Sequence, residues 1–366
     1  MIDGPSRVQE TSLLEALVEH SGRFRHLDIS ADAHNEPASL MASIEGLFAE
    51  EYVPVSEGHL VDAAMLASAN LLFLRVSYDT SPEKAERFRD SYKLFLSSND
   101  GSPSLLAKRV VKWISATAML LKAQPEFVRS GIGAAARNKI GYDEISAEFT
   151  DELRLTTKYF HQLTDYFWRE ILTKRVLAGR RYLEVGPGRG WVKSLGWPSG
   201  AYYQGLELSN EMRDLNPDKE TIVLGSAGSL PCVSKSFDGV FGSLLDPFLL
   251  PNFLFEAQRV VTDEGWFAGT APAGDWARSL RGKNVAATDF MLRSGRTTTV
   301  SSFCYTAIEL DYLLGCAGFK NIDIKSCNVT DSFESIPPAV SAVVDETGAD
   351  IPIVLEWTAT RSSEFF

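Results

Sequence analysis

The sequence predicts an α/β protein, with a Rossmann-like, doubly wound and mostly parallel sheet of seven strands preceded by an all-α domain. From about residue 140 onward, short apolar segments of strand length alternate with segments of helical periodicity, which is the order of a doubly wound sheet. Before that point the pattern is helical and carries almost no strand signal. We therefore divide the 366 residues into an accessory domain, 1–140, and a sheet domain, 141–366.

Composition narrows the class of protein. A hydrophobic content of 45% with 23% charged residues is typical of a globular chain with a sizeable core. The net charge of −12 argues against partners such as nucleic acid or anionic membrane. We expect no signal peptide, because the first residues lack a basic start and a long apolar run. We expect no membrane span either, because the most apolar expected helical segment, 61–74, is too short and too polar. The four cysteines have no metal-ligand spacing, so we expect a cytoplasmic protein without a metal site.

The accessory domain is expected to be a set of helices. Several expected helices start at Ser or Pro, residues that favour the first turn, and the segment 23–37 is expected to be a loop. The expected helices are 7–20, 37–52, 58–77, 82–97, 103–123 and 125–138. Three roles stay open for this domain: a wall of a substrate pocket, a contact in a homodimer, or a module that binds a partner.

A helix is expected from residue 151 to about 177, before the first strand. Tyr159, Leu163, Phe167 and Ile171 recur at a spacing of four, so this face is expected to pack on the sheet. His161 lies on the same helix, as a structural residue or as a base that faces the substrate.

The first strand, 182–185, runs into a loop that contains Gly186, Gly188 and Gly190, and a helix is expected at 191–196. A glycine backbone lets a ligand lie directly on the loop, at the carboxyl end of a parallel sheet. Three glycines alone would also suit a plain turn, or a nicotinamide or flavin site.

The second strand, 202–208, narrows the choice of ligand. Glu207 lies near its end, where a carboxylate can accept both hydroxyls of a ribose, and Leu208 follows it. The spacing Gly-x-Gly-x-Gly favours S-adenosylmethionine (SAM) over a dinucleotide. Glu184, inside the first strand, can hold the ammonium of a methionine tail.

A third strand, 221–224, is followed by a turn in which Ser226 and Ala227 are expected to flank adenine. Together these blocks make residues from about 140 to 360 resemble a class I SAM-dependent methyltransferase, of the broad type that includes ubiquinone- and menaquinone-pathway enzymes. The resemblance is carried by Leu183–Gly190, Gly205–Ser209, Gly225–Pro231, Phe237–Asp238, Glu256–Gly265 and Ala317–Phe319. Ser226 stands where that family usually has an Asp near the adenine amino group. In that family the linking region, here 140–149 with Tyr142, lies over the cofactor.

The fourth strand, 237–243, ends at Ser243, and the segment after it is where this fold presents residues to the transferred methyl group. Asp246-Pro247-Phe248 is similar to the Asn/Asp-Pro-Pro-Tyr/Phe signature of enzymes that methylate amino groups. It lacks the second proline and lies about three residues late, so we interpret the match as chance. Asp246 remains a candidate base or an anchor for a substrate amine.

The remaining expected elements are helices 252–261 and 306–315 and strands 265–271, 321–329 and 351–360, with a long connection at 330–350. An insertion, 272–302, carries five basic residues against two acidic ones. It is expected to be either a solvated surface loop or a substrate lid whose arginines bind a carboxylate or phosphate, with Trp276 as an apolar anchor. The basic residues are Arg278, Arg281, Lys283, Arg293 and Arg296.

The expected function is SAM-dependent transfer of a methyl group to O, N or C of a small-molecule acceptor in specialised metabolism. Two alternatives stay open: methylation of a peptide or protein with the helical domain as docking module, or SAM binding without turnover. The expected catalytic residues are His161 and Asp246, and the expected substrate residues are Tyr142, Trp276, Arg278 and Arg281. The expected cofactor residues are Glu184, Gly186, Gly188, Gly190, Glu207, Leu208, Ser226, Ala227 and Ser243.

Overall fold

A computed structural model of the chain describes Phe127 and residues 134–149, 154–228, 230–282, 286–329, 336–347 and 351–362. These residues belong to one compact unit, Pro125–Phe366. The helices expected before residue 124 and the loop expected at 23–37 lie outside the described residues.

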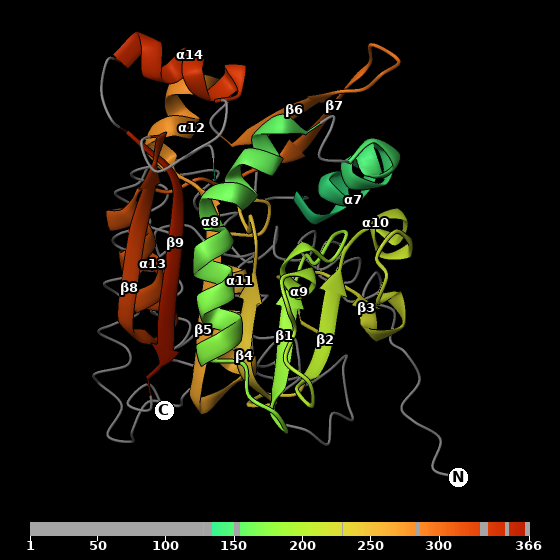
Figure 1. The fold of residues 1–366 in the computed structure, drawn as a ribbon, viewed down its shortest axis with the longest axis vertical. Coiled ribbons are helices and arrows are strands. Elements are labelled where there is room, and N and C mark those ends of the chain that lie inside the picture. The colour runs from blue at the N-terminus through green and yellow to red at the C-terminus, as the bar shows by residue number, and fades with distance from the viewer. Residues whose placement is uncertain are drawn as a thin grey trace, which may run out of the picture. The chain divides into compact units, whose positions relative to one another are not determined.

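Seven strands form the central sheet in the order β3-β2-β1-β4-β5-β9-β8 (Figure 1). The first five pair in parallel, and β9 is antiparallel to both β5 and β8. This confirms the predicted Rossmann-like sheet of seven mostly parallel strands. The strands are β1 (Arg181–Val185), β2 (Tyr202–Glu207), β3 (Ile222–Leu224), β4 (Phe237–Gly242), β5 (Val261–Pro272), β8 (Phe319–Asn328) and β9 (Pro352–Arg361).

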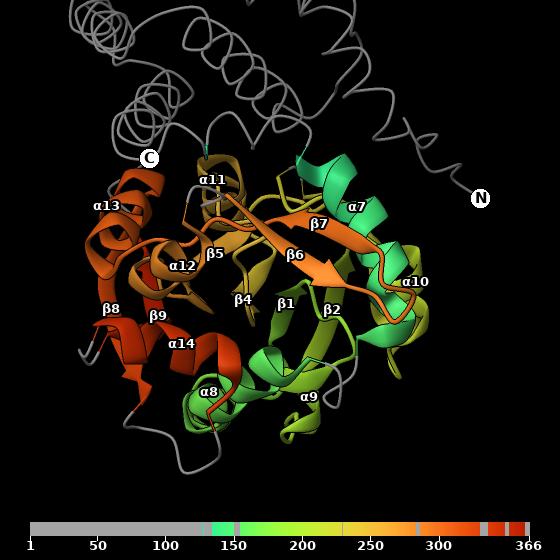
Figure 2. The same cartoon turned by 90° about the horizontal axis from the view of Figure 1, so that it is seen from above.

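Helices α8 (Leu155–Lys174) and α9 (Trp191–Ser194) lie on one face of the sheet, and α11 (Pro251–Val260) and α13 (Ala307–Ala317) lie on the other (Figure 2). On the first face, Trp168 of α8 joins a buried cluster with Phe241 and Trp266. On the second, the Phe253 and Phe267 ring centroids are 5.9 Å apart. Trp266 and Phe267 are neighbours on β5 and point to opposite faces, as the pleat of a strand requires. The core is therefore a three-layer α/β/α sandwich.

The insertion between β5 and α13 is folded. It holds α12 (Gly274–Arg281) and an antiparallel hairpin of β6 (Ala287–Met291) and β7 (Thr297–Ser301), which forms its own two-stranded sheet. The hairpin crosses above the carboxyl ends of the parallel strands (Figure 2). The expectation of a solvated surface loop is therefore wrong for this segment. The Thr297–Ser301 run is rich in β-branched residues, which favour strand.

Other boundaries differ from the sequence expectation by a few residues. β5 begins at Val261 because Val261 pairs with Phe237, ahead of an irregular register that resumes at Gly239 and Trp266. The long connection before β9 contains α14 (Pro338–Thr347). The expected linking region is helical, with α7 (Ala134–Ile145) and the short 3-10 helix η1 (Ser146–Glu148). Two further short helices, α10 (Asn210–Asp214) and the 3-10 helix η2 (Lys219–Thr221), follow β2.

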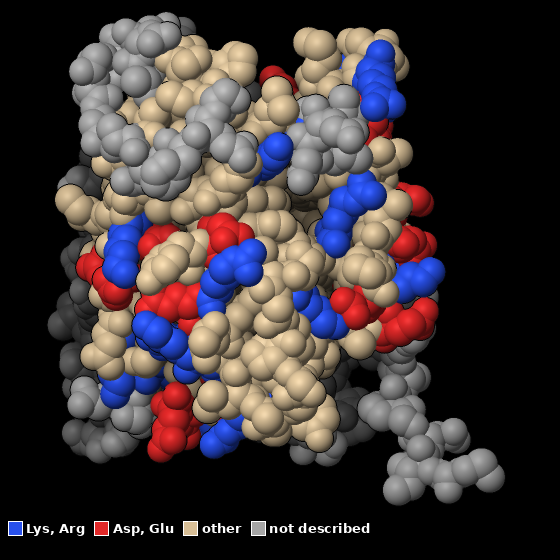
Figure 3. Space-filling model, in the orientation of Figure 1, with Lys and Arg blue, Asp and Glu red and all other residues tan. Residues whose placement is uncertain are grey.

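The face that carries α8 shows basic and acidic side chains interspersed (Figure 3). On α8 itself, Arg169 pairs with Asp165 and Lys174 with Glu170, each one helical turn apart. No concentration of one charge sign marks a polyanion-binding surface on the part of this face that the structure describes. Among the described helices, none is long and apolar enough to cross a membrane.

Candidate functional site

The loop after β1 adopts left-handed backbone conformations. Gly186, Gly188 and Gly190 have φ values of 65°, 50° and 81°, which glycine adopts without steric cost. The Gly186 N–H donates to the Leu206 carbonyl at 2.8 Å, and the Asn216 side chain donates to the Gly188 carbonyl at 2.8 Å. These bonds hold the loop in one shape at the carboxyl ends of β1 and β2.

Glu207 ends β2 and is buried, with 4% of its surface exposed. Its carboxylate accepts backbone N–H groups from Gly188 at 3.1 Å, Leu208 at 2.8 Å and Ser209 at 3.2 Å. Burial raises the pKa of Glu207, and these three donors oppose that rise. The acid predicted to bind ribose is thus tied directly to the glycine loop.

Glu184 lies inside β1 and is also buried. The Tyr203 hydroxyl donates to its Oε2 at 2.7 Å. Burial raises the pKa of Glu184 to about 7, although the Tyr203 hydrogen bond and the nearby Lys193 charge lower it. A cation placed beside this carboxylate would offset its desolvation, which suits the ammonium that the sequence assigns to it.

The segment after β4 folds back over the glycine loop. A Cβ added to Gly186 would lie 2.7 Å from Cε2 of the Phe248 ring, so a larger residue would have to displace this ring. Leu244 has a φ of 53°, an uncommon conformation for a bulky residue. The Leu244 N–H donates to Oγ1 of Thr270 at 3.0 Å, and the Ser243 hydroxyl lies 3.4 Å from the same atom. The strained turn therefore places Asp246 and Phe248 at the carboxyl edge.

Asp246 lies in a polar network that the sequence did not predict. The Ser302 hydroxyl donates to Asp246 Oδ2, and Arg281 donates to the Ser302 hydroxyl at 2.8 Å and to its carbonyl at 3.3 Å. Burial raises the pKa of Asp246 to about 6, while the Arg281 charge and the Ser302 hydrogen bond lower it. Burial also raises the pKa of the neighbouring Cys304 thiol to about 11. Of these two acids, Asp246 is the one whose pKa lies near neutral pH.

Tyr142, on α7, links the two ends of the site. Burial raises the pKa of its hydroxyl well above the usual value, and the charges of Asp246 and Glu207 raise it further. The hydroxyl is therefore within electrostatic reach of both carboxylates. The next residue, Asp143, accepts a hydrogen bond from the Ser209 hydroxyl at 2.5 Å, which ties α7 to the segment that follows the end of β2.

The hairpin and α7 are joined to each other. Asn138 donates to the Pro247 carbonyl at 3.1 Å and accepts from the Ser301 N–H at 2.6 Å. Arg296 forms an ion pair with Glu144 at 3.0 Å. Together α7 and the hairpin form a cover over the carboxyl edge of the sheet (Figure 2).

The remaining predicted residues occupy varied surroundings. The His161 ring stacks on Trp191 of α9, with centroids 4.0 Å apart. Trp276 is buried, with its ring edge-on to Phe160 at 5.2 Å. Arg278 forms an ion pair with Glu309 at 2.5 Å, in the capping box of α13. This ion pair joins α12 to α13.

In the turn after β3, the Ser226 hydroxyl accepts the Gly228 N–H at 3.3 Å, and Ala227 is buried. Leu208 is half-buried beside Glu207. The structure thus brings Glu184, the glycines, Glu207, Tyr142, Asp246 and Arg281 to one edge of the sheet. Ser302 and Asn138 belong there too. No sequence pattern marks them, because their partners are more than 50 residues away in the chain.

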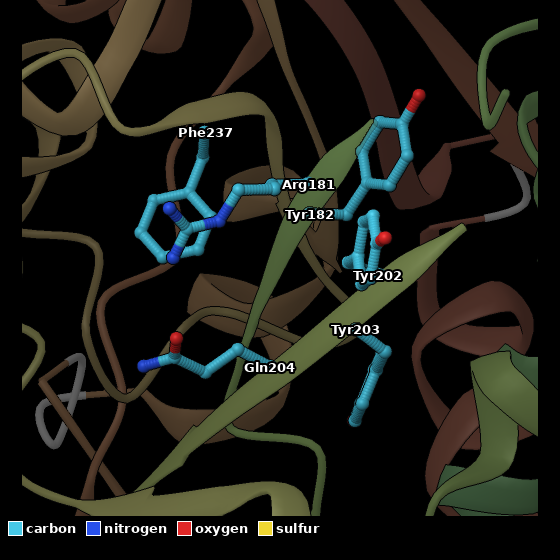
Figure 4. Close-up of a pocket in the computed structure, with 6 residues that line it drawn as sticks. All are labelled: Arg181, Tyr182, Tyr202, Tyr203, Gln204 and Phe237. Atoms are coloured by element: carbon cyan, nitrogen blue, oxygen red, sulfur yellow. The ribbon is translucent and has the colours of Figure 1, made fainter. Parts of the chain in front are cut away.

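A separate cavity of about 270 Å³ lies at the opposite edge, where β1, β2 and β4 begin (Figure 4). Arg181, at the start of β1, lies with its guanidinium 5.5 Å from the centroid of the Phe237 ring. Tyr182, Tyr202, Tyr203 and Gln204 complete its lining. It contains none of the predicted site residues.

No family model matches the sequence, and no curated protein matches it significantly. Among solved structures, a SAM-dependent methyltransferase of Thermotoga maritima is 16% identical, with 61% of this chain and 99% of that chain covered and a TM-score of 0.42. Phosphoethanolamine N-methyltransferase 2 of Haemonchus contortus is 13% identical, with 62% and 60% covered and a TM-score of 0.42. Geranyl diphosphate C-methyltransferase of Streptomyces coelicolor is 10% identical, with 54% and 75% covered and a TM-score of 0.42.

These identities and TM-scores are low, so the fold is assigned from the sheet itself. Three features assign the fold: the strand order, the single antiparallel strand between β5 and β8, and the glycine loop after β1. By those features, the described part of the chain has the Rossmann-like fold of the class I SAM-dependent methyltransferases.

Proposed function

We propose that the protein transfers the methyl group of SAM to an O, N or C atom of a small-molecule acceptor. The observation that carries this proposal is the hydrogen bond between Glu207 and the glycine loop. A buried carboxylate at the end of β2 is held 3.1 Å from the Gly188 N–H, at the edge where this fold binds adenosine-type ligands.

The residues at this edge fit the cofactor. Glu207 has a carboxylate at the place expected for ribose hydroxyls, and the loop backbone has no side chains at its three glycines. Glu184 is a desolvated carboxylate that a cation would stabilise. Ser226 and Ala227 would flank adenine, and Leu208 and Ser243 would complete the binding surface. When bound, SAM supplies a methyl group that is already electrophilic.

The chain then has to orient the acceptor and accept its proton. Holding two reactants in the reactive geometry can contribute about 7–11 kcal/mol of the barrier. Asp246 is the proposed base, since its pKa of about 6 leaves it mostly ionised at neutral pH and close to the optimum for proton transfer. Arg281 and Ser302 hold it in place. His161 is the second candidate base, although its ring stacks on Trp191.

The finer assignments belong to this proposal too. The acceptor belongs to specialised metabolism, and the protein works in the cytoplasm. The helical domain expected at residues 1–140 supplies a pocket wall or a homodimer contact, and its expected end lies inside the compact unit that begins at Pro125. Trp276 and Arg278 support the acceptor pocket from α12, and Tyr142 and Arg281 face it.

Two measurements test the proposal. Calorimetry with S-adenosylhomocysteine (SAH), the demethylated product, should give saturable binding, and a nicotinamide or flavin should give none. Incubation with methyl-labelled SAM and separate metabolite and peptide pools should place the label in the metabolite pool. Label in the peptide pool would favour the protein-methylating alternative. SAH binding without transfer to either pool would favour a SAM-binding protein without turnover.

A further inference from the structure

Arg154, immediately before α8, has a guanidinium with a buried, unsatisfied edge. Its Nε and Nη2 atoms are both buried, and neither has a hydrogen-bond partner among the described residues. Burial lowers the pKa of this guanidinium, and the charge of Glu148 opposes that shift. A buried donor without an acceptor is costly, and a buried charge more so.

In two other arginines, the edge formed by Nε and Nη2 binds a carboxylate. Arg169 uses Nε and Nη2 to bind both carboxylate oxygens of Asp165, at 2.6 and 3.2 Å. Arg259 uses the same two atoms to bind both oxygens of Glu256, at 2.7 Å each. In Arg154 this edge is left for an oxyanion with the same fork geometry, such as a carboxylate or a phosphate.

A row of aromatic rings leads from Arg154 towards the proposed base. The guanidinium carbon lies 4.8 Å from the centroid of Phe290, on β6, in a cation–π contact. Phe290 lies 6.5 Å from Phe149, and Phe149 lies 6.4 Å from Tyr142, centroid to centroid. All three residues are half-buried, so part of each residue stays accessible. Tyr142 in turn senses the charge of Asp246.

We infer that Arg154 is the subsite for an anionic group of the methyl acceptor, whose apolar or aromatic body lies along Phe290 and Phe149. The acceptor class is thus an amphipathic small molecule with a carboxylate or phosphate at one end and its nucleophilic atom near Asp246. This inference rests on the proposed function for the identity of the ligand as an acceptor.

The position of Phe290 favours the acceptor over the cofactor as the source of the anion. Phe290 belongs to the inserted hairpin, which pairs with no strand of the central sheet. The cofactor-binding features lie instead on β1, β2 and the glycine loop. An anionic group bound between the hairpin and the start of α8 therefore contacts the insertion and not the cofactor-binding strands. This position favours the acceptor as the source of the anion.

The test uses the full chain and three matched probes: 2-naphthoate, 2-naphthyl phosphate and the neutral 2-naphthamide. Calorimetry is run without SAH and with saturating SAH, on wild type, Arg154→Gln, Arg154→Lys and Arg169→Gln. Arg169→Gln is the control, since it removes the same guanidinium edge from an exposed ion pair on α8. Thermal melts establish that each variant is folded.

Wild type and Arg169→Gln should bind one of the anions about tenfold or more tightly than the amide, the effect of a charge-assisted pair. Arg154→Gln should bind the anion and the amide equally, with SAH affinity unchanged. Arg154→Lys should lose part of the preference, because its point charge lacks the bidentate edge. The better anion, naphthoate or naphthyl phosphate, identifies the acceptor group.

Three results would overturn the inference: no anion preference in wild type, a preference retained in Arg154→Gln with SAH affinity unchanged, or a preference retained in Arg154→Gln with SAH affinity lost. The last would make the carboxylate of the cofactor the partner of Arg154. Absence of SAH binding to wild type, with an Arg154-dependent anion preference, would contradict the proposed cofactor and leave the anion subsite standing.

Discussion

The carboxylate of Glu207 accepts the Gly188 N–H at 3.1 Å, which joins the end of β2 to the loop that follows β1. Two adjacent parallel strands end side by side at this point, since Val185 and Leu206 are register partners. The hydrogen bond therefore makes the acid and the glycine loop one preformed unit, and a ligand that contacts one of them contacts the other.

Replacement of Glu207 by Gln should weaken SAH binding by about tenfold to a hundredfold, because one lost charge-assisted hydrogen bond is of this size. In the wild type, both carboxylate oxygens of Glu207 accept backbone N–H groups. The NH2 group of a glutamine side chain would face one of these N–H groups as a second donor. Calorimetry measures the affinity, and Glu220→Gln, an exposed change on η2, is the control. An affinity within twofold of wild type would remove Glu207 from the cofactor site.

Glu184 predicts how stability without ligand varies with pH. Its pKa is raised from 4.5 to about 7, so the folded protein keeps a proton that the unfolded chain loses first. Stability should therefore fall as pH rises from about 4.5 to about 7, by an amount on the order of 3 kcal/mol. Glu184→Gln should lose the Glu184 contribution and keep only the decline that the raised pKa values of Asp246 and Glu207 cause, so it should be the more stable protein at pH 8. Urea unfolding at pH 5 and pH 8 measures it, and parallel curves for both proteins would contradict the assignment.

The same residue predicts proton release on binding. If the ammonium of SAH lies beside Glu184, the bound carboxyl has a lower pKa than the unbound one. Binding at pH 6.5 should then release a proton, and SAH affinity should rise between about pH 5 and pH 7. Calorimetry in buffers of different ionisation enthalpy counts the proton. Glu184→Gln should release none, and equal release by both proteins would place the ammonium elsewhere.

Gly186 is constrained both by its backbone and by a ring. Alanine there must adopt a φ of 65°, at a cost of about 1–2 kcal/mol, and its Cβ must also displace Phe248. Gly179→Ala isolates the first effect, because Gly179 has a φ of 77° with no atom within 4 Å of an added Cβ. Gly186→Ala should lower the free energy of unfolding more than Gly179→Ala does.

A double-mutant cycle separates the two contributions. Phe248→Ala removes the ring, so Gly186→Ala should cost less in that background, with a coupling of about 1 kcal/mol or more. Additive effects would show that the ring moves aside without cost. In that case the positive φ alone would explain the glycine.

Local patterns predicted the sheet because most of its strands contain short segments with buried apolar residues between turns, although β8 also carries charged residues such as Lys320 and Asp323. The glycine loop, Glu184 and Glu207 could be found for the same reason: they lie within 24 residues of one another at the ends of two adjacent strands. Alternation of strands and helices then implied the doubly wound order that the structure has.

The cover of the site could not be found in this way. The Asp246–Ser302, Asn138–Ser301 and Arg154–Phe290 contacts each join segments more than 50 residues apart. The fold also decides whether an arginine forms an ion pair within the protein or stays available to a ligand. The insertion stands out by its basic charge, yet Arg278 holds Glu309 and Arg296 holds Glu144. Arg154, which no pattern distinguishes, has no hydrogen-bond partner for Nε and Nη2 in the part of the chain that the structure describes.

Asp246→Asn should lower the rate of methyl transfer by about 10²–10⁴-fold and leave SAH affinity unchanged, because the amide keeps the shape and cannot accept a proton. The assay uses the acceptor identified by label transfer. Asp275→Asn, an exposed change in the first turn of α12, should keep the wild-type rate. A rate for Asp246→Asn within threefold of wild type would exclude Asp246 as the base.

The pH profile gives a second, independent reading of the same carboxylate. Only the ionised form can accept a proton, so kcat/KM for the acceptor, measured at saturating SAM, should fall tenfold per unit below about pH 6, the pKa of Asp246. The Arg281 charge and the Ser302 hydrogen bond both lower that pKa, so removing either one must raise it. Arg281→Gln and Ser302→Ala should therefore move the acid limb to higher pH, whatever they do to the maximal rate. A limb that stays in place in both variants would mean that a different group, such as His161, accepts the proton.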